Sequence, residues 1–190
     1  INSIYGLSIR DTNSICKDKN GFIWTSSKSG VLRVTDSDYS IYQLPFTTAD
    51  VFSVKLVYKN DVLYAFSNNG QVFRYDEIYD RFSLITDIRP IVGNNNLLII
   101  QMVVDNSEGL WLVTTTGLYM YRDNSVIHVN EEEGEILSIC EFDEGHLFAI
   151  TEEGIYILDQ QTYEKQIEYL HPEGVRYNAT KSYYDTDYGR

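Results

Sequence analysis

The sequence is poor in cysteine and proline and has no long apolar run. Its 190 residues include 2 cysteines and 3 prolines. Two thiols make neither a disulfide framework nor a zinc site, and proline-rich linkers are absent. The most apolar stretch, 97–104, has the length of a strand, whereas a membrane-spanning helix needs about 20 residues. Nothing in the sequence therefore predicts a membrane span.

Basic residues are also scarce. The chain has 15 Lys and Arg against 28 Asp and Glu, a formal net charge of −13. Binding to duplex nucleic acid needs a basic footprint, so we expect no nucleic-acid partner. Anionic membrane surfaces are disfavoured for the same reason.

Residues that favour strands are abundant. Hydrophobic residues make up 43% of the chain and aromatic residues 14%, with 16 tyrosines. Charged residues make up 23%, which is within the range of globular proteins. Tyr, Ile, Val and Thr fit the surface of a pleated sheet. The composition predicts a globular domain rich in strands.

A repeat organises the chain. Four aromatic residues are each followed by a hydroxyl residue three positions later and by a glycine six positions later. In chain order the sets are Trp24, Ser27, Gly30; Tyr64, Ser67, Gly70; Trp111, Thr114, Gly117; and Phe148, Thr151, Gly154. Four matches in register indicate one structural unit that is used four times.

Each repeat reads as four short strands. The first strand of repeat one is predicted at 14–17, and polar turns with Asp, Asn and Gly separate it from the strand that carries the aromatic residue. The shared glycine ends a second turn, as in a β-hairpin. Four strands in about 40 residues are typical of a propeller blade, whose apolar faces are buried only when blades stack.

We therefore predict an all-β fold, a fragment of a β-propeller with about four four-stranded antiparallel blades and a truncated fifth. Residues 1–190 form a single partial propeller in this interpretation. The predicted boundaries are 9–46, 47–90, 91–130, 131–172 and the incomplete 173–190.

Both ends of the chain point to a longer protein. The chain begins at Ile1 rather than Met, and no signal peptide is visible, so we expect a preceding segment. Residues 183–190 repeat the first strand and turn of a blade. We expect an open arc of blades that can form a homodimer through its uncovered faces.

Repeats one and three resemble a known family. The pattern Asp18-x-x-Gly21-Phe22-Ile23-Trp24-x-x-Ser27-x-x-Gly30 is similar to the two-component regulator propeller repeat. The stretch from Asp105 through Trp111 to Leu118 resembles the same repeat. Repeat two departs from it, with Asp61-Val62-Leu63-Tyr64, and repeat four has Phe148 in place of Trp.

The resemblance implies a function. In that family such repeats form the periplasmic sensor region of hybrid two-component histidine kinases of Bacteroidetes, inner-membrane proteins that usually carry two seven-bladed propellers. Their ligands are typically oligosaccharides. The resemblance thus implies carbohydrate sensing and signal transduction, with the remaining blades and a kinase in the parent chain.

Some single residues invite a functional interpretation, but structural roles fit them better. Trp24 and Trp111 could stack on sugar rings, yet their repeated position predicts blade core. Cys16 and Cys140 occupy places that Leu56 and Val103 hold in the other repeats, which predicts small buried apolar residues without a disulfide.

The acidic groups and histidines fit structural roles as well. Asp105-Asn106 and Asp185-Thr186-Asp187 lack the rest of a calcium loop and fit turns. Glu131, Glu132 and Glu133 fit a solvated loop between blades. The histidines His128, His146 and His171 have neither metal-site nor triad spacing.

The sequence thus identifies no catalytic residue, no metal ligand and no cofactor, and it leaves the ligand-binding residues open. The first hypothesis is a non-enzymatic extracytoplasmic sensor module that responds to oligosaccharides. The alternatives are a protein-interaction propeller without a small ligand and, third, a propeller polysaccharide lyase or hydrolase.

Overall fold

The computed structural model describes residues 12–46, 51–129, 136–152 and 154–170. The chain divides into two compact halves, Ile1–Ile99 and Ile100–Arg190. Each half is described by itself. The predicted fifth blade, 173–190, lies outside the described residues, and the assignment of the chain to one partial propeller stays a prediction.

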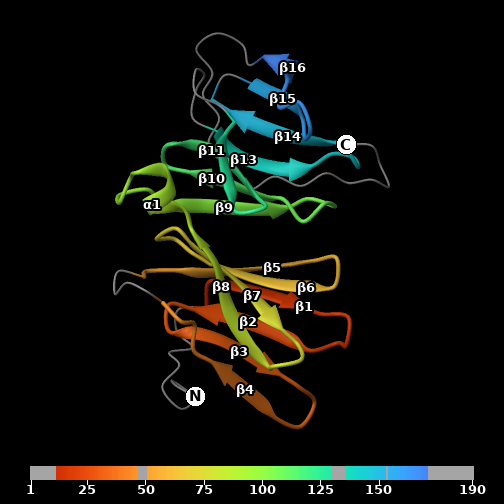
Figure 1. Cartoon of the computed structure of the whole chain (residues 1–190). Helices are drawn as coiled ribbons and strands as arrows, with labels where there is room; N and C mark the ends of the chain where they lie inside the picture. The colour runs from red at the N-terminus through yellow and green to blue at the C-terminus, as the bar shows by residue number, and fades with distance from the viewer. Residues whose placement is uncertain (1–11, 47–50, 130–135, 153, 171–190) are drawn as a thin grey trace. The chain divides into compact units, whose positions relative to one another are not determined.

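The N-terminal half contains two sheets, blade 1 and blade 2, and a short helix (Figure 1). Blade 1 consists of β1 (Ser14–Lys17), β2 (Ile23–Ser27), β3 (Gly30–Val34) and β4 (Tyr39–Tyr42). Blade 2 consists of β5 (Val54–Lys59), β6 (Val62–Ser67), β7 (Gln71–Asp76) and β8 (Arg81–Asp87), and α1 (Ile88–Val92) follows.

The C-terminal half contains blade 3 and blade 4. Blade 3 consists of β9 (Ile99–Val104), β10 (Leu110–Thr114), β11 (Gly117–Arg122) and β12 (Ser125–His128). Blade 4 consists of β13 (Ile136–Glu141), β14 (His146–Thr151), β15 (Gly154–Asp159) and β16 (Lys165–Leu170). In all four sheets the strands lie in chain order, so each repeat is one meander. The predicted four-stranded sheets are confirmed.

Helix α1 was not anticipated by the all-β prediction. The Asp87 carboxylate accepts a hydrogen bond from Arg89 N at 3.1 Å and caps its start. Gly93 ends it with a left-handed backbone, φ 74°. Both are ordinary helix-boundary signals in the sequence, but five residues are too few to show a helical pattern.

The shared hydroxyl and glycine of each repeat shape the turn between its second and third strands. The hydroxyl accepts a backbone hydrogen bond inside that turn, at 3.2 Å for Ser27 with Ser29 N and at 3.2 Å for Thr151 with Gly154 N. A Cβ added at Gly154 would overlap the carbonyl oxygen of Tyr169, on the fourth strand. Glycine is therefore needed where the third strand begins against the fourth.

An aspartate ties the tryptophan to the first turn in blades 1 and 3. Asp18 accepts hydrogen bonds from Phe22 N at 3.0 Å and from the Trp24 indole Nε1 at 2.7 Å. Asp105 does the same for Gly109 N and for Trp111 Nε1, at 2.7 Å and 2.9 Å. The spacing of six residues between the aspartate and the tryptophan thus corresponds to a hydrogen bond between a turn and a core ring.

Blades 2 and 4 replace both partners of this bond. Where Trp becomes Tyr64 or Phe148, the residue six positions earlier is Tyr58 or Phe142. The rings of Phe142 and Phe148 lie 4.4 Å apart. An aromatic residue thus replaces the aspartate wherever the indole N–H is missing, so no carboxylate is left without its donor at that place.

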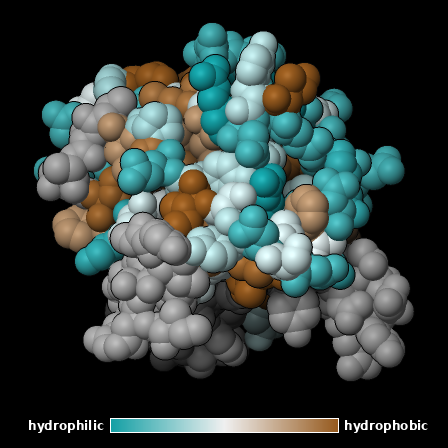
Figure 2. Space-filling model, turned by 90° about the horizontal axis from the view of Figure 1, so that it is seen from below, coloured by the Kyte–Doolittle hydropathy of each residue, from teal (hydrophilic) through white to brown (hydrophobic). Residues whose placement is uncertain are grey.

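Each half has a core that two blades build together. The core of the N-terminal half comprises Trp24, Val31, Tyr42, Leu44, Val54, Leu56, Leu63, Ala65, Phe73 and Phe82. The core of the C-terminal half comprises Trp111, Val113, Leu118, Met120, Ile136, Ile139, Leu147, Ala149, Tyr156 and Leu158. On the face shown in Figure 2, apolar residues form separate patches among hydrophilic ones. Burial between blades is therefore what holds each pair of sheets together.

The glycine position can be tested with two glycines of blade 4. We expect Gly154→Ala to lower the free energy of unfolding by about 1–3 kcal/mol, because its methyl group would displace the β16 backbone. In Gly145→Ala the new Cβ would have its nearest contact at 3.9 Å, with Asp143. The free energy of unfolding measured in urea should therefore be close to the wild-type value for Gly145→Ala. Equal losses for the two variants would contradict this role of Gly154.

The tie between the turn and the indole can be tested at Asp105, which is fully buried and also pairs with Arg122. We expect Asp105→Ala to destabilise the chain by about 2–4 kcal/mol, because the indole and two backbone N–H groups lose their acceptor. The control is Glu144→Ala, at an exposed turn residue of blade 4. If chemical denaturation gave both variants the same midpoint, the tie would be dispensable.

Candidate functional site

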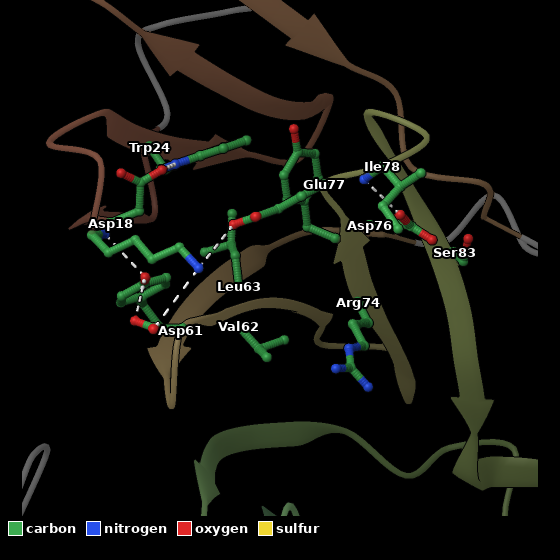
Figure 3. A pocket seen from close by; sticks show the side chains of 13 residues that line it. Asp18, Trp24, Asp61, Val62, Leu63, Arg74, Asp76, Glu77, Ile78 and Ser83 are labelled. Atoms are coloured by element: carbon green, nitrogen blue, oxygen red, sulfur yellow. Dashed lines mark hydrogen bonds and ion pairs between the residues drawn. The ribbon is translucent and has the colours of Figure 1, made fainter.

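A pocket of about 460 Å³ lies at the end of blades 1 and 2 where three turns meet. Its walls come from the β1–β2 turn, the β5–β6 turn, the β7–β8 turn and the adjoining strand ends (Figure 3). The lining residues are Asp18, Lys19, Trp24, Tyr58, Asp61, Val62, Leu63, Arg74, Tyr75, Asp76, Glu77, Ile78 and Ser83. Aromatic rings and charged groups thus share one concave surface, which is typical of a ligand site.

Blade 1 supplies the β1–β2 turn and the edge of a core ring. Asp18 holds this turn through the bonds to Phe22 and Trp24, and Asn20 N donates to the same carboxylate at 2.9 Å. Lys19 follows in the turn, and its side chain is 42% exposed. Blade 1 therefore presents a hydrogen-bonded turn with one partly exposed, positively charged side chain.

Blade 2 supplies Tyr58, at the place where blade 1 has Asp18. The Tyr58 hydroxyl accepts a hydrogen bond from Lys19 N at 3.0 Å and donates to Asp61 Oδ1 at 3.2 Å. Burial raises the pKa of Tyr58, and the neighbouring Asp61 carboxylate adds to the rise. The hydroxyl stays protonated and joins the first turns of the two blades.

The β5–β6 turn places Asp61 at the rim. Asn60 and Asp61 both have left-handed backbones, φ 51° and 62°, as in a two-residue hairpin turn. Asp61-Val62 is the point where repeat two departs from the glycine of the other repeats. Tyr58, Asp61 and Val62 all line the pocket, so the departures from the repeat and the pocket coincide.

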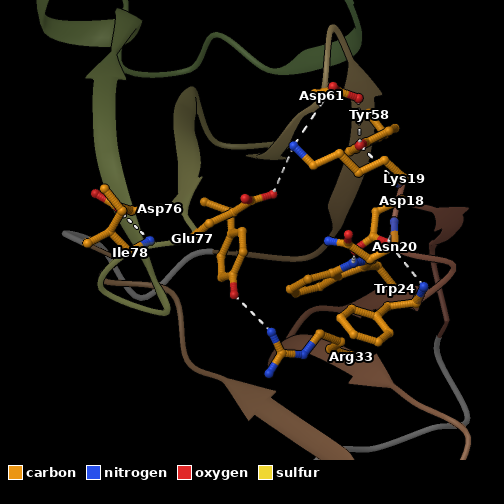
Figure 4. Close-up of polar contacts among 12 residues, drawn as sticks. Asp18, Lys19, Asn20, Trp24, Arg33, Tyr58, Asp61, Asp76, Glu77 and Ile78 are labelled. Atoms are coloured by element: carbon orange, nitrogen blue, oxygen red, sulfur yellow. Dashed lines mark hydrogen bonds and ion pairs between the residues drawn. The ribbon is translucent and has the colours of Figure 1, made fainter.

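Lys19 bridges the blades by charge (Figure 4). Its ammonium Nζ lies 3.8 Å from Asp61 Oδ2 and 3.7 Å from Glu77 Oε1. The two carboxylate side chains are 66% and 56% exposed. Exposed ion pairs of this kind contribute little to stability, about 0–1 kcal/mol each. The Lys19 side chain can therefore move away from these two carboxylates at a small cost in free energy.

Below the pocket, a polar network fixes Tyr75. The Asp80 carboxylate accepts hydrogen bonds from the hydroxyls of Tyr75 and Tyr42, and Arg33 lies 3.2 Å from it. Arg33 also stacks on Trp24, with 5.4 Å from its guanidinium carbon to the ring centroid. The hydrogen bond from Tyr75 lowers the pKa of Asp80, and the Tyr42 bond and Arg33 add to this effect. Residues of both blades thus hold this wall of the pocket.

The titratable groups of the lining are carboxylates, tyrosines, one lysine and one arginine. The described lining residues include no His and no Cys. Within the part of the chain that the structure describes, no group of three or more His, Cys, Asp or Glu side chains is arranged to hold a metal ion. What the pocket offers is aromatic contact, hydrogen bonding and charge.

The tryptophans and Asp105 have the structural roles predicted for them. Trp24 and Trp111 are core residues, exposed by 1% and 0%. Asp105 holds its turn through Ser107 N, Gly109 N and the indole of Trp111.

The cysteines agree with the prediction in part. Cys16 and Cys140 form no disulfide, as predicted, but each is half-buried rather than fully buried. Burial, with help from Asp18, raises the pKa of Cys16 to about 11. This thiol therefore stays protonated and is a poor nucleophile.

Neither of the two described histidines, His128 and His146, is a lining residue of the pocket. His128 lies on β12 and stacks on Tyr119, with ring centroids 4.4 Å apart. His146 begins β14 and contacts Asp143 at 2.7 Å. His171, Glu131–Glu133 and Asp185–Asp187 lie outside the described residues.

Sequence reasoning missed Lys19, Glu77 and the other lining residues as site residues. Lys19 and Glu77 are ordinary charged turn residues, and their meeting depends on contacts between blades. The available signal was the departure of repeat two at Tyr58 and Asp61, where a repeat rule is broken without an obvious gain in stability.

Comparison with solved structures supports the fold class. No protein-family model and no curated protein matches the sequence. The WD40 β-propeller domain of Doa1 aligns with 87% of this chain and 57% of its own length, at 16% identity and a TM-score of 0.60. The fold class is therefore confirmed: the chain is almost all β, and its four-stranded antiparallel sheets are those of a β-propeller fragment.

Two further structures indicate the range of proteins that share this fold. The extracellular domain of a hybrid two-component system of B. thetaiotaomicron aligns with 87% of this chain at 18% identity and a TM-score of 0.63. A gluconolactonase of Xanthomonas campestris aligns with 93% at 14% identity and a TM-score of 0.61. The chain spans a quarter of the length of the first structure and 66% of the second. An extracellular domain of a two-component system and an enzyme thus both share the fold.

None of the described helices is long and apolar enough to cross a membrane.

The network below the pocket predicts a dependence of stability on pH. Because the folded pKa of Asp80 lies below its ordinary 3.8, its ionised form stabilises the fold, and that contribution disappears as the pH falls through the folded pKa. We expect the melting temperature of the wild type to fall more steeply below pH 3.8 than the melting temperature of Asp80→Asn. Asp36→Asn, at an exposed turn of blade 1, should keep the wild-type profile. Identical acid profiles for wild type and Asp80→Asn would contradict the network.

Proposed function

We propose that this chain is part of a non-enzymatic, extracytoplasmic sensor of a hybrid two-component system, and that its pocket binds an oligosaccharide. The pocket is the observation that carries the proposal. It joins the partly buried rings of Tyr58 and Tyr75 to exposed acceptors and donors at the rim. Flat apolar rings beside hydrogen-bonding groups suit a sugar, which has both C–H faces and hydroxyl edges.

Two other observations support the proposal. The repeat pattern around Trp24 and Trp111 resembles the two-component regulator propeller, and the extracellular domain of a hybrid two-component system shares the fold. In this proposal the parent protein lies in the inner membrane of a Bacteroidetes cell. The sensor faces the periplasm, works as a homodimer with the remaining blades and controls a histidine kinase.

The location of the pocket suggests how binding could be transmitted. Lys19 belongs to blade 1, and Tyr58, Asp61 and Glu77 belong to blade 2. A ligand that contacts both sets of residues favours one packing of the two blades over another. It shifts a conformational equilibrium by its difference in affinity for the two arrangements.

The test is calorimetric titration of the chain with oligosaccharides. We expect binding, and we expect Tyr58→Ala to weaken it by about tenfold, because a lost aromatic contact contributes about 1.4 kcal/mol. Tyr79→Ala is the matched control, since Tyr79 is 68% exposed and does not line the pocket. Ser83→Tyr, at an exposed lining residue, should also weaken binding by filling the pocket without disturbing the core.

Two outcomes would contradict the proposal. If the folded chain binds no oligosaccharide, ligand sensing by this pocket is wrong. If the sugars are cleaved during incubation, the lyase or hydrolase alternative replaces it.

One observation favours the protein-interaction alternative. Ile78 and Tyr79, at the tip of the β7–β8 turn, are 88% and 68% exposed. Adjacent exposed apolar residues on a turn can anchor a partner protein. Capture of a partner by wild type but not by Tyr79→Ala, with no effect of sugars on melting, would favour this alternative.

A further inference from the structure

The pocket lining is unevenly charged. Four carboxylates line it, from Asp18, Asp61, Asp76 and Glu77, against two cations, Lys19 and Arg74. The whole chain carries a net charge of −13. A ligand therefore enters a field that favours positive charge.

The four carboxylates are not equivalent. Asp18 is occupied by its turn and by the Trp24 indole. Asp76 holds its own turn, accepting from Ile78 N at 2.9 Å and from Tyr79 N at 3.1 Å. These two are structural, which leaves Asp61 and Glu77 as the acidic groups that can respond to a ligand.

Asp61 and Glu77 converge on one place from different turns. Both face the Lys19 ammonium, at 3.8 Å and 3.7 Å, and both are more than half exposed. Those separations exceed the 2.7–2.9 Å of a direct charge-assisted hydrogen bond. Each carboxylate oxygen has two lone pairs. Both carboxylates can therefore accept hydrogen bonds from the ammonium group of a ligand. The Lys19 side chain would move aside to make room for it.

The aromatic wall lies beside this acidic pair. Tyr58 donates its hydroxyl hydrogen to Asp61 and thereby orients that carboxylate. Tyr75 is held by Asp80 and Arg33. A small molecule with a ring and an ammonium group could therefore place its ring against the tyrosine rings and its ammonium group beside the two carboxylates. A ring that carries a carboxylate would face Asp61 and Glu77 with the same sign of charge.

We propose that the pocket selects saccharides that carry a protonated amino group, and that it rejects uronate saccharides. This inference rests on the proposed function and names the class of sugar. Asp61 and Glu77 are the residues that read the charge, and Tyr58 and Tyr75 contact the sugar ring. Two exposed charge contacts of about 0.2–1 kcal/mol each correspond to a preference of about tenfold over a neutral ring.

The experiment compares three trisaccharides and one amine without a ring by calorimetry in slightly acidic, low-salt buffer. They are a glucosamine trisaccharide, its N-acetylated neutral form, a galacturonate trisaccharide and spermidine. We expect the amino trisaccharide to bind about tenfold more tightly than the neutral one and the uronate to bind most weakly. The preference should shrink as salt rises, because exposed charge contacts are screened.

Two variants assign the preference to its residues. Asp61→Asn and Glu77→Gln should each lower the ratio of amino-sugar affinity to neutral-sugar affinity, because each removes a negative charge and keeps a hydrogen-bonding group. Asn also accepts the left-handed backbone of residue 61, with φ 62°, so the fold is preserved. Glu152→Gln removes a carboxylate at an exposed residue of blade 4 and should keep the wild-type preference.

The outcomes separate this inference from the proposed function. Equal binding of the amino and neutral sugars, or tighter binding of the uronate, overturns the charge selection and leaves oligosaccharide binding standing. Spermidine binding as tightly as the amino trisaccharide overturns the inference as well, because the site would then read an ammonium group without a sugar ring. If no saccharide binds, the inference and the proposed function fail together.

Discussion

The burial of one blade against the next is the constraint on which the structure depends. A sheet of four short strands has two faces, and blade 1 alone would leave the ring of Trp24 in water. In the N-terminal half this ring instead packs against Tyr75 and Phe82 of blade 2, with ring centroids 4.8 Å and 6.2 Å apart. The hydrogen bond from the indole to Asp18 then ties this core to the β1–β2 turn. The stability of the interior and the position of the surface turn are thereby coupled.

Because of that coupling, the rings at the base of the pocket are held by core contacts, whereas the side chains at its rim are exposed and weakly held. The floor consists of Trp24 and Tyr75, both fixed by partners in the core and in the Asp80 network. The rim consists of the exposed side chains of Lys19, Asp61 and Glu77, which are joined by ion pairs close to 4 Å, and Asp61 also accepts a hydrogen bond from Tyr58. Such a division suits recognition, since the rings give a preformed surface and the rim rearranges at little cost.

The repeat made most of the fold predictable. The four glycines recur because the same turn between the second and third strands recurs in each blade, and in blades 1 and 4 because Gly30 and Gly154 also lie against the fourth strand. The predicted strand 14–17 is observed as β1. Helix α1 was missed because it interrupts the repeat once and is only five residues long.

The pocket was not predictable in the same way. Lys19 meets Asp61 and Glu77 through the packing of two repeats, and a pattern that describes one repeat contains no information on such contacts. Tyr58 was the exception, because its departure from the aspartate of repeats one and three is visible in the sequence. Its partner Lys19, 39 residues earlier, becomes visible only when the blades are stacked.

The division of the pocket between two repeats has a consequence for how such a site is inherited. A gene duplication that copies one blade copies only the residues which that blade contributes to a pocket between blades. The copied residues then lie against a different neighbouring blade. Ligand preference can therefore change by altering a single turn such as Asn60–Asp61, while the core rings and glycines that each blade needs stay as they are. A chain of repeats can diversify at its junctions and conserve its interior.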